Sequence, residues 1–592
     1  MKNFVISDWS AKHTDPTLDN YFHFELLKKS NFSDLRNTNN KFFHVTNQEE
    51  LVNASDYVVE KHNYYLYLLS QKLNEIHKTH FSLEFWKRSF SQGLLRQITL
   101  LHQVFISFEH SFDPKLFNFT SLSESSFSTY NNFEEQRNFL DSFLGQEQLF
   151  SIYINCFYPN YHNKKFSIKK KFNIKNFFLN TKKIISFNKK IFLSKFRSEG
   201  KAYKSCKVLL LGCYFSASYI KKLKEISKFR IAHLNTITDS KKHRFNLLMR
   251  SNLSKDFDIF DRFDEFFFFS LKYLLPKDFV EGFKFKIKYY DNLLKSFPKL
   301  KYIVSEAWLG STNINMFRSL ALEKYGIKTY YNEHNCILHP YKGNFINFII
   351  NNVDKYLTFG WKSSNPKFIS TSSLFPFSIN FSKTIEKKSN ILYVSYSADY
   401  FFPKYNSAWS NKGYGSVEHL YFVQRFFNLI PDRVKYDISY RSFPQDYGRK
   451  GLRFDKDKLL CECLNGVKFV NSYLFKGDSC KEQMLSSRLV IIDYLSTSYL
   501  ECIHMNIPTI CFWDPKTMSL KDSYTGFFDD LISAKIVHTS PDSAAKHVEE
   551  VYINPEVWWK SETVQNLKNK WLNRNFGDKS KLVNFLVDLS LE

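Results

Sequence analysis

Residues 488–513, RLVIIDYLSTSYLECIHMNIPTICFW, decide the fold class of this chain. Arg488–Asp493 has the composition of a short buried strand that ends in an acid, and Pro508–Trp513 is a second apolar run of strand length. Between them, Tyr499–Met505 has the pattern of a helix. A strand, a helix and a second strand at this spacing predict parallel strands buried on both faces, the repeating unit of a doubly wound α/β domain.

The same alternation of strands and helices extends outward from this stretch. In the C-terminal half the expected strands include Asn390–Ser395 and Tyr436–Tyr440, with a helix over Val417–Leu429 between them. A helical pattern over Ile314–Tyr325 is followed by Gly326, which stands where a helix ends. Four apolar runs of strand length surround that helix: Lys207–Cys213, Tyr302–Ser305, Thr329–Asn332 and Lys355–Phe359.

The chain is therefore predicted to have five parts. Residues 1–160 are mainly helical, because apolar residues recur every three or four positions over 66–76 and again over 85–108. A basic insertion or arm over 161–204 separates this region from the rest. The other parts are a first α/β domain over 205–361, a linker rich in Ser, Pro, Asn and Lys over 362–389, and a second α/β domain over 390–592.

Length and composition limit the classes of protein to which the chain can belong. With 592 residues, 43% of them hydrophobic and 24% charged, it is a multidomain globular protein rather than a disordered one. No uncharged apolar run approaches the roughly 18 residues of a membrane-spanning helix, and the first residues lack the apolar core of a secretory signal. The nine cysteines are an odd number without regular spacing, and Cys461-x-Cys463 stands without a second close pair. We therefore expect a cytoplasmic protein with reduced thiols, no metal site and no cofactor.

Half of the excess charge lies in one segment. The chain carries a formal net charge of +25, and residues 163–204 hold 13 lysines and one arginine against one glutamate. Phenylalanines are interspersed among these lysines without a regular period. The segment is either a basic arm that binds an anionic membrane surface or a solvated loop. A nucleic-acid-binding protein is a further interpretation of the charge, but no recognisable binding module accompanies it.

The hydroxyl cluster Ser496, Thr497 and Ser498 follows the strand that ends in Asp493 and stands where the next helix begins. A helix N-terminus offers unpaired N–H groups and the positive end of the helix dipole, so it suits a phosphate. Glu501 lies three residues beyond Ser498 and faces the same side. The alternative is a capping box, in which Ser498 caps the helix and Glu501 bonds back to its N–H. Because ligands bind at the carboxyl ends of parallel strands, we predict a phosphate-binding site here that includes Asp493.

Arg441 follows the strand Tyr436–Tyr440 of the same domain. Guanidinium groups form bidentate pairs with phosphates and carboxylates, so Arg441 is a candidate to contact the same ligand. An ordinary surface arginine is the alternative.

Residues 493–513, with their acid, tyrosine, hydroxyl cluster, second acid and Pro-initiated strand, resemble the donor half of GT-B glycosyltransferases. They are similar in particular to polymerases that use CDP-glycerol and to the Kdo transferases of capsule synthesis. Over nearly the whole chain, the sequence resembles the LIC12162 family of surface-carbohydrate transferases, which are linked to O-antigen synthesis. The matching residues are Phe85-Trp-Lys-Arg88, Ser305-Glu306, Asn332-Glu-His334, Thr358-Phe-Gly-Trp361, Ser496-Thr-Ser-Tyr-Leu-Glu501, Asn506-Ile-Pro-Thr509, Phe512-Trp-Asp-Pro515, Ser543-Ala-Ala545 and Trp558-Trp559.

This resemblance implies a GT-B-like fold, in which two Rossmann-like domains face a cleft beside an N-terminal helical region. It implies a metal-independent glycosyltransferase that binds a nucleotide-sugar in the second domain, with a CMP-linked ulosonic or nonulosonic acid favoured. The acceptor would be a lipid-linked or growing glycan of a surface polysaccharide or O-antigen, reached at the inner face of the cytoplasmic membrane. An epimerase of sugar nucleotides with the same shape is the alternative enzyme.

Three polar residues stand at strand ends of the first domain and are candidates for catalysis. Glu306 follows Tyr302–Ser305, and Glu333 and His334 follow Thr329–Asn332. Sugar transfer needs a group that takes the acceptor's proton or stabilises a positively charged sugar carbon, so we predict that one of the three is the base. For His334 the alternative is a structural histidine. The family would have a glycine-containing turn after this histidine, whereas this chain has Asn-Cys-Ile-Leu-His-Pro there, which predicts an altered acceptor side.

Overall fold

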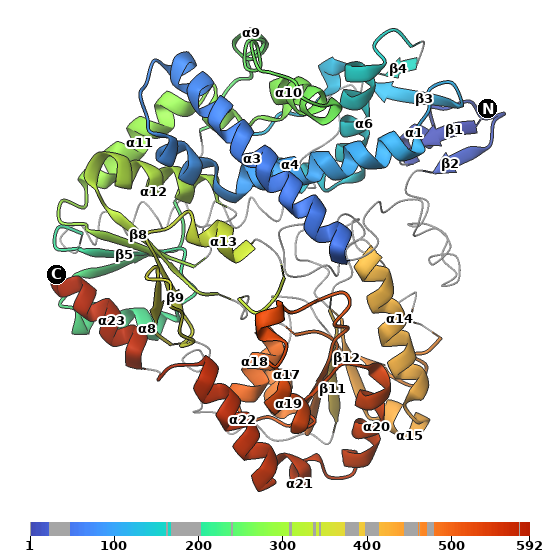
Figure 1. Ribbon diagram of the computed structural model, residues 1–592, viewed down its shortest axis with the longest axis vertical. Helices are drawn as coiled ribbons and strands as arrows, with labels where there is room; N and C mark the ends of the chain where they lie inside the picture. Colours follow the sequence, from blue (N-terminus) through green and yellow to red (C-terminus); the bar gives the residue numbers. More distant parts are fainter. Residues whose placement is uncertain are drawn as a thin grey trace.

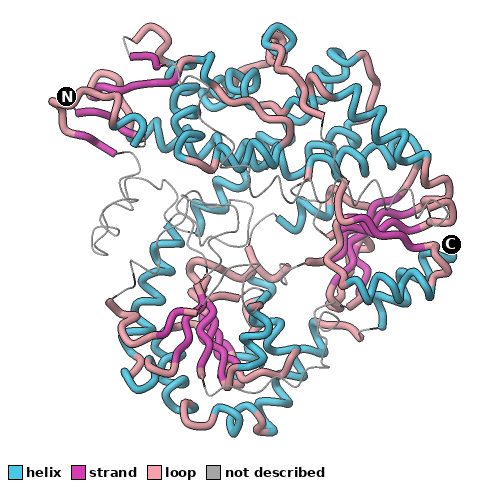
Figure 2. Tube along the Cα trace, turned by 180° about the vertical axis from the view of Figure 1, so that it is seen from behind, coloured by secondary structure: helices cyan, strands magenta, loops and turns pink. Residues whose placement is uncertain are grey.

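Three parallel sheets organise the protein (Figures 1 and 2). The computed structural model describes residues 2–6, 8–22, 48–161, 164–166, 203–237, 241–306, 311–334, 339–342, 345–372, 390–396, 414–442, 460, 462–470, 479–495, 497–578 and 580–592. In Figure 1 the N-terminal helices and a small sheet lie at the top, one six-stranded sheet lies at the left, and the other lies below. The predicted class, two Rossmann-like α/β domains with an N-terminal helical region, is confirmed.

The first six-stranded sheet has the strand order β10-β9-β8-β7-β5-β6, and all of its neighbouring strands are parallel. Its apolar strands are buried because helices cover both faces. The helices that connect them include α8 (Ala217–Ile226), α12 (Thr312–Tyr325) and α13 (Phe345–Ile350). Gly326 ends α12 with a left-handed φ of +64°, as its place in the sequence predicts. The strands are β5 (Val208–Leu211), β6 (Ile231–Leu234), β7 (Tyr302–Ser305), β8 (Lys328–Asn332), β9 (Lys355–Thr358) and β10 (Phe368–Ser370).

The second six-stranded sheet has the order β13-β12-β11-β14-β15-β16 and is also parallel throughout. Counted along the chain, this is the 3-2-1-4-5-6 order of dinucleotide-binding folds. Its strands are β11 (Ile391–Val394), β12 (Ile438–Arg441), β13 (Lys468–Phe469), β14 (Leu489–Ile492), β15 (Thr509–Phe512) and β16 (Val537–His538). The main helices are α14 (Tyr414–Leu429), α17 (Cys480–Ser486), α18 (Thr497–His504) and α20 (Pro541–Val551).

A long helical hairpin forms the centre of the N-terminal region. It consists of α3 (Gln48–His77) and α4 (Leu83–Ser111), which carry the two predicted apolar stripes. α10 (Arg262–Leu274) is inserted between β6 and β7 in the sequence, yet it packs against α4 in this region (Figure 1). α4 also packs on α12, and Arg88 of α4 donates to Asp354 and Thr329 of the first sheet's domain. The N-terminal region and the first domain therefore share one hydrophobic core.

The N-terminal region also contains a four-stranded parallel sheet that the helical prediction for residues 1–160 missed. Its strands are only three to six residues long and mix polar residues with phenylalanines, so no apolar run marks them. In the order of the sheet they are β2 (Asn20–Phe22), β1 (Lys2–Val5), β3 (Phe117–Leu122) and β4 (Lys164–Phe166). β4 contains the beginning of the basic segment 163–204, and most of the rest of that segment lies outside the described residues.

The C-terminal helix α23 (Ser580–Leu591) crosses back to the first domain, beneath the first sheet in Figure 1. Its Leu582, Leu586 and Leu589 side chains pack against that sheet, whereas the preceding helix α22 (Glu562–Asn575) stays with the second domain. The predicted second domain, 390–592, therefore extends too far. The sequence of a helix with one apolar face does not reveal which of two sheets that face will cover. β10 also departs from the prediction, because this edge strand of half-exposed residues falls in the predicted linker 362–389.

Backbone contacts join the six-stranded domains beyond the carboxyl ends of β8 and β9. Tyr341 forms an antiparallel bridge with Leu520 of the second domain. Where the chain crosses back, the N–H of Gly577 donates to the carbonyl of Phe359 at 2.8 Å. A Cβ atom on Gly360 would lie 1.8 Å from the Gly577 nitrogen, so this close approach requires glycine.

Candidate active site

Each six-stranded sheet has one point where the strand order reverses, and both points carry a buried carboxylate. In the first sheet the chain leaves β5 toward β6 on one side and returns as β7 on the other, and Glu306 directly follows β7. In the second sheet the reversal lies between β11 and β14, and Asp493 directly follows β14. Ligands of open parallel sheets bind at the carboxyl ends of the strands beside such a reversal. These two edges are therefore the places where a functional site is expected.

Glu306 joins three strands of the first sheet at this edge. Its Oε2 atom accepts a hydrogen bond from the backbone N–H of Tyr214, after β5, at 2.7 Å, and its Oε1 accepts one from the Asn332 amide of β8. The side chain is buried, and this desolvation raises the pKa of Glu306 to about 7. The carboxyl group can therefore hold or release a proton near neutral pH.

His334 is the solvent-accessible neighbour of Glu306. Its Nδ1 atom lies 4.0 Å from Glu306 Oε2, and its side chain is 26% exposed. The imidazole stacks on the ring of Tyr214, with the centroids 4.6 Å apart and the planes 22° from parallel. At 4.0 Å the two groups are an ion pair when charged, and a small movement would bring them within hydrogen-bond distance. The first edge thus presents a carboxylate–imidazole pair in which the imidazole faces outward.

Glu333 lies beside His334 in the sequence, but its carboxylate is directed elsewhere. Its Oε2 atom accepts hydrogen bonds from the Phe359 backbone N–H and the Trp361 indole, each at 2.8 Å. Burial raises the pKa of Glu333 to about 8 despite these bonds. His339 in turn stacks on Trp361 at 3.9 Å, and burial lowers the pKa of His339 to about 3. Of the three predicted catalytic residues, the structure brings Glu306 and His334 together and directs Glu333 into the contact between the domains.

The helix N-terminus next to Glu306 already holds a protein carboxylate. Glu134, from α5 (Phe133–Leu140) of the N-terminal region, accepts hydrogen bonds from the backbone N–H of Thr312 at 2.9 Å and from its hydroxyl at 2.8 Å. Thr312 is the first residue of α12. Glu134 thus takes the position where an anionic ligand of the first domain would bind.

In the second domain, Asp493 ties β14 to β11. Its carboxylate accepts hydrogen bonds from the Tyr396 backbone N–H at 2.7 Å, the Ser395 hydroxyl at 3.0 Å and the Tyr393 hydroxyl at 3.2 Å. His419 of α14 places Nε2 3.6 Å from the same carboxylate, and both side chains are buried. The sequence predicted that Asp493 contacts the ligand, because it ends a strand beside a hydroxyl cluster. In the structure, hydrogen bonds within the protein engage both of its carboxylate oxygens.

The hydroxyl cluster lies at the start of α18, as predicted. Thr497 is the first residue of this helix, and no acid stands in its first turn. Ser498 is the second helical residue and shares a hydrogen bond with the Tyr494 hydroxyl at 3.3 Å, so it is not the residue that caps the helix. Ser496 lies outside the described residues.

Glu501 and Arg441 lie in a polar cluster near this helix. Burial raises the pKa of Glu501 and lowers the pKa of Lys481, and the attraction between the two opposes both shifts. Arg441 donates to the Gln483 side chain at 2.8 Å. Burial raises the pKa of Cys480 to about 11, and the charges of Arg441 and Glu501 act on that thiol in opposite directions. Sequence reasoning missed the α17 residues, because the short helix between two loops carries no apolar pattern, only a capping box at its start.

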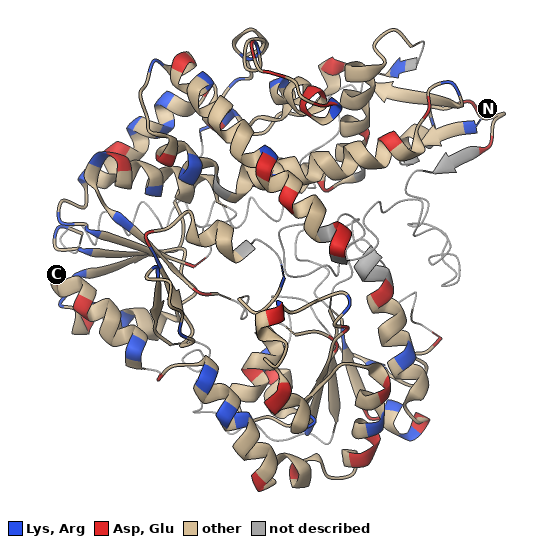
Figure 3. Cartoon of the chain, in the orientation of Figure 1, with Lys and Arg blue, Asp and Glu red and all other residues tan. Residues whose placement is uncertain are grey.

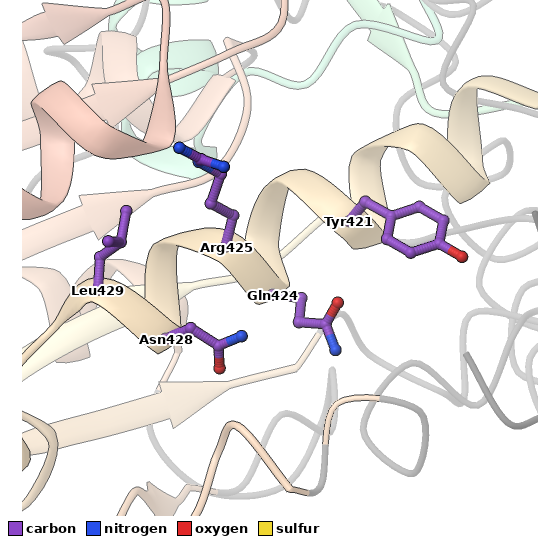
Figure 4. A pocket seen from close by; sticks show the side chains of 5 residues that line it. All are labelled: Tyr421, Gln424, Arg425, Asn428 and Leu429. Carbon is purple, nitrogen blue, oxygen red and sulfur yellow. The ribbon is translucent and has the colours of Figure 1, made fainter. Parts of the chain in front are cut away.

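A hollow of about 490 Å³ lies on the outer side of α14, away from both edges. Figure 4 shows the side chains that line it, which all project from this helix: Tyr421, Gln424, Arg425, Asn428 and Leu429. Arg425 is paired with Asp542 of α20 at 2.6 Å. The second half of α14 runs back toward the amino ends of the strands, so this hollow does not belong to the candidate site.

Along the described helices, Lys and Arg residues are interspersed with Asp and Glu residues (Figure 3). Examples are the exposed pairs Arg433–Glu549 and Lys535–Glu550. Among the residues that the structure describes, no three His, Cys, Asp or Glu side chains gather closely enough to hold a metal ion. Within the same ranges, no helix combines the length and the apolar composition needed to cross a membrane.

Comparisons with known proteins identify a family. The sequence matches the model of the LIC12162 family transferases over residues 5–584. No curated protein matches it. Similar solved structures include the wall teichoic acid polymerase TagF (11% identity, covering 71% of this chain and 98% of that one, TM-score 0.31), MurG of Acinetobacter baumannii (11%, 65% and 99%, 0.31) and the spinosyn rhamnosyltransferase SpnG (10%, 65% and 100%, 0.31). Because these TM-scores are low, the assignment to a family rests on the family model alone.

Proposed function

This chain belongs to the LIC12162 family of transferases, and from that premise we propose that it transfers a sugar from a nucleotide-sugar to a glycan acceptor. The donor binds the second domain and the acceptor binds the first. The observation that carries this proposal is the Glu306–His334 pair, a carboxylate and a quarter-exposed imidazole at the strand-order reversal of the first sheet. Such a pair is suited to accept the proton of a hydroxyl nucleophile.

The two helix N-termini support the assignment of donor and acceptor to separate domains. In the first domain Glu134 binds the start of α12, so a nucleotide phosphate would meet a carboxylate there. In the second domain α18 begins with hydroxyl residues, Lys481 lies near Glu501 of the same helix, and Arg441 lies near Cys480, whose thiol also feels the charge of Glu501. We assign the donor phosphate to the α18 N-terminus with Ser496, Thr497 and Ser498.

The remaining donor contacts follow from this placement. Glu501 is suited to accept hydrogen bonds from ribose or sugar hydroxyls, and Arg441 to pair with a phosphate or carboxylate. Asp493 supports the site by holding β11 beside β14. The resemblance to enzymes that use cytidine nucleotides favours a CMP-linked ulosonic or nonulosonic acid as the donor.

The chemistry proceeds by displacement at the sugar carbon that bears the nucleotide. The acceptor oxygen forms the new bond to this carbon while the bond to the phosphate oxygen breaks, and the nucleotide leaves with the electron pair. His334 takes the acceptor's proton, and Glu306, 4.0 Å away, stabilises the imidazolium that results. The α18 dipole and the nearby cations stabilise the negative charge on the leaving phosphate. Glu333 acts by holding the backbone that carries His334.

We further propose that the enzyme works on a lipid-linked or growing surface glycan of the O-antigen type at the inner face of the cytoplasmic membrane. The support is the net charge of +13 over 163–204 with interspersed phenylalanines. Each basic residue near an anionic leaflet contributes about 1 kcal/mol, and the attraction fades within a Debye length. Sedimentation with anionic vesicles at low and high salt tests this. Deletion of 163–204 should abolish a salt-sensitive binding, and equal binding of both forms would contradict the proposal.

The transfer itself is tested with a panel of CMP-, CDP- and UDP-sugars, with and without glycan acceptors. Release of free nucleotide that depends on the acceptor is the expected result. Interconversion of the sugar without transfer would instead identify an epimerase. If no nucleotide or nucleotide-sugar binds in calorimetry, the donor assignment is wrong.

A further inference from the structure

The turn that follows β5 is held rigidly, although it ends in an exposed residue. Gly212 adopts a left-handed φ of +66°, and its N–H donates to the Leu234 carbonyl at 2.8 Å. The Cys213 thiol donates to the Val304 carbonyl of β7, and its own carbonyl lies 3.1 Å from His233 Nε2. Each residue before Tyr214 is therefore fixed to a neighbouring strand, so the turn is in place before any ligand arrives.

Tyr214 combines a fixed backbone with an exposed side chain. Its N–H is bound to Glu306 at 2.7 Å, yet its side chain is 67% exposed. The His334 imidazole stacks on one face of the ring, with the centroids 4.6 Å apart and the planes 22° from parallel. A large, exposed aromatic ring on a rigid turn at a strand-order reversal is what a binding site requires, because ordering it on binding costs little entropy.

We propose that Tyr214 forms the acceptor subsite by stacking against the apolar C–H face of a sugar ring. This inference rests on the proposed function and deepens it by naming the group that recognises the acceptor. A tyrosine ring offers an apolar face to a sugar's C–H groups and a hydroxyl to the sugar's own hydroxyls. His334 covers one face of the Tyr214 ring, so the sugar packs against the other face. We assign this sugar to the acceptor rather than the donor, because Tyr214 and His334 lie at the same edge of the first domain, to which the acceptor is assigned.

Saturation-transfer NMR tests this subsite directly, with the methyl glycosides of glucose, galactose, N-acetylglucosamine and rhamnose as probes. The protein should transfer saturation to the ring protons of at least one glycoside. Tyr214→Ala should weaken that binding about threefold to tenfold, as expected for loss of one stacking contact, whereas Tyr214→Phe and Tyr214→Trp should keep it. Tyr436→Ala, which removes a tyrosine of 68% exposure in the second domain, is the matched control and should change nothing.

Calorimetry with CMP, CDP and UDP separates this inference from the donor assignment. Tyr214→Ala should bind these nucleotides as the parent does. If it loses nucleotide affinity, Tyr214 contacts the donor and the inference is wrong. Equal saturation transfer in Tyr214→Ala and the parent, or none to any glycoside in the parent, also overturns it. If sugar binding depends on Tyr214 while the parent binds no nucleotide, the inference holds and the donor assignment fails.

Discussion

The two six-stranded domains carry the same arrangement of groups at their strand-order reversals, yet they use it differently. In each domain a buried carboxylate accepts the backbone N–H of a tyrosine at 2.7 Å and has a histidine nearby. In the first domain His334 lies 4.0 Å from Glu306 and is 26% exposed. In the second, His419 lies 3.6 Å from Asp493, and its side chain is only 4% exposed.

Surroundings rather than residue types therefore decide whether such a pair can transfer a proton or only holds two strands together. Asp493 also accepts bonds from two hydroxyls, so its charge is satisfied inside the protein. Within the part of the chain that the structure describes, Glu306 accepts hydrogen bonds from a backbone N–H and an amide but from no hydroxyl, and its partner His334 reaches solvent. A satisfied carboxylate holds two strands together, whereas a carboxylate beside an accessible imidazole can take part in proton transfer.

The largest expected effect comes from breaking the pair in the first domain. His334→Asn and Glu306→Gln should each lower the rate of transfer by about 10²–10⁴, the usual contribution of general-base catalysis. Because desolvation raises the pKa of Glu306 to about 7, the carboxylate that stabilises the His334 imidazolium is lost as the pH drops below that value, and the parent rate should fall. The pH profile of Glu306→Gln should lack the step that belongs to this carboxyl. Steady-state kinetics from pH 5 to 9 measures both.

The exposed His110 at the end of α4 provides the control for these variants. His110→Asn should match the parent in rate and pH profile. If His334→Asn and Glu306→Gln both stay within a few-fold of the parent, the base lies elsewhere.

The next effect concerns the donor. Changing Ser496, Thr497 and Ser498 together to Ala should weaken the binding of CMP, CDP or UDP roughly tenfold to a hundredfold, because each lost hydrogen bond to a charged phosphate costs about 1.5–3 kcal/mol and water replaces part of it. Calorimetry measures the affinity, and circular dichroism checks the fold.

A triple change of Ser123, Ser125 and Ser126 to Ala, in a turn of the N-terminal region, removes as many hydroxyls and should leave the affinity unchanged. Unchanged affinity in the first triple variant would refute the α18 assignment.

Disrupting the hydrogen bonds of Asp493 in the second domain should lower the free energy of unfolding. Asp493→Asn replaces an acceptor of three hydrogen bonds with a group that can accept at one atom only, so it should destabilise the protein by about 1–3 kcal/mol. The control is Asp542→Asn, which breaks an exposed pair with Arg425 and should cost less than about 1 kcal/mol. Urea unfolding measures both. If both variants lose the same free energy of unfolding, the hydrogen bonds of Asp493 do not hold β11 beside β14.

The sequence predicted both domains because continuous apolar runs mark buried parallel strands. It also placed Glu306, His334 and the hydroxyl cluster at strand ends, which follows from topology alone. It could not distinguish Asp493 from Glu306, because both are acids after an apolar strand. Their different partners come from β11, the residues after it and α14 for Asp493, and from β8 and the residues that follow β5 and β8 for Glu306. Tyr214 was missed for the same reason, since its exposure depends on the turn at Gly212.

The smallest expected effect concerns Glu333, at the contact between the domains. Burial raises the pKa of Glu333 from its ordinary value near 4.5 to about 8, so the folded protein binds a proton there more tightly than the unfolded chain does. The stabilisation is therefore complete below about pH 4.5 and is lost as the pH rises through about 8. Glu333→Gln keeps an acceptor for Phe359 and Trp361 but does not titrate. The melting temperature of the parent, relative to this variant, should therefore fall between pH 5 and 8. Asp542→Asn should instead melt in parallel with the parent over this range, because the bond to Arg425 lowers the pKa of Asp542 from its ordinary value of 3.8 and its carboxyl stays charged throughout. A parent and Glu333→Gln that melt in parallel across this range would show that the buried carboxyl does not hold its proton.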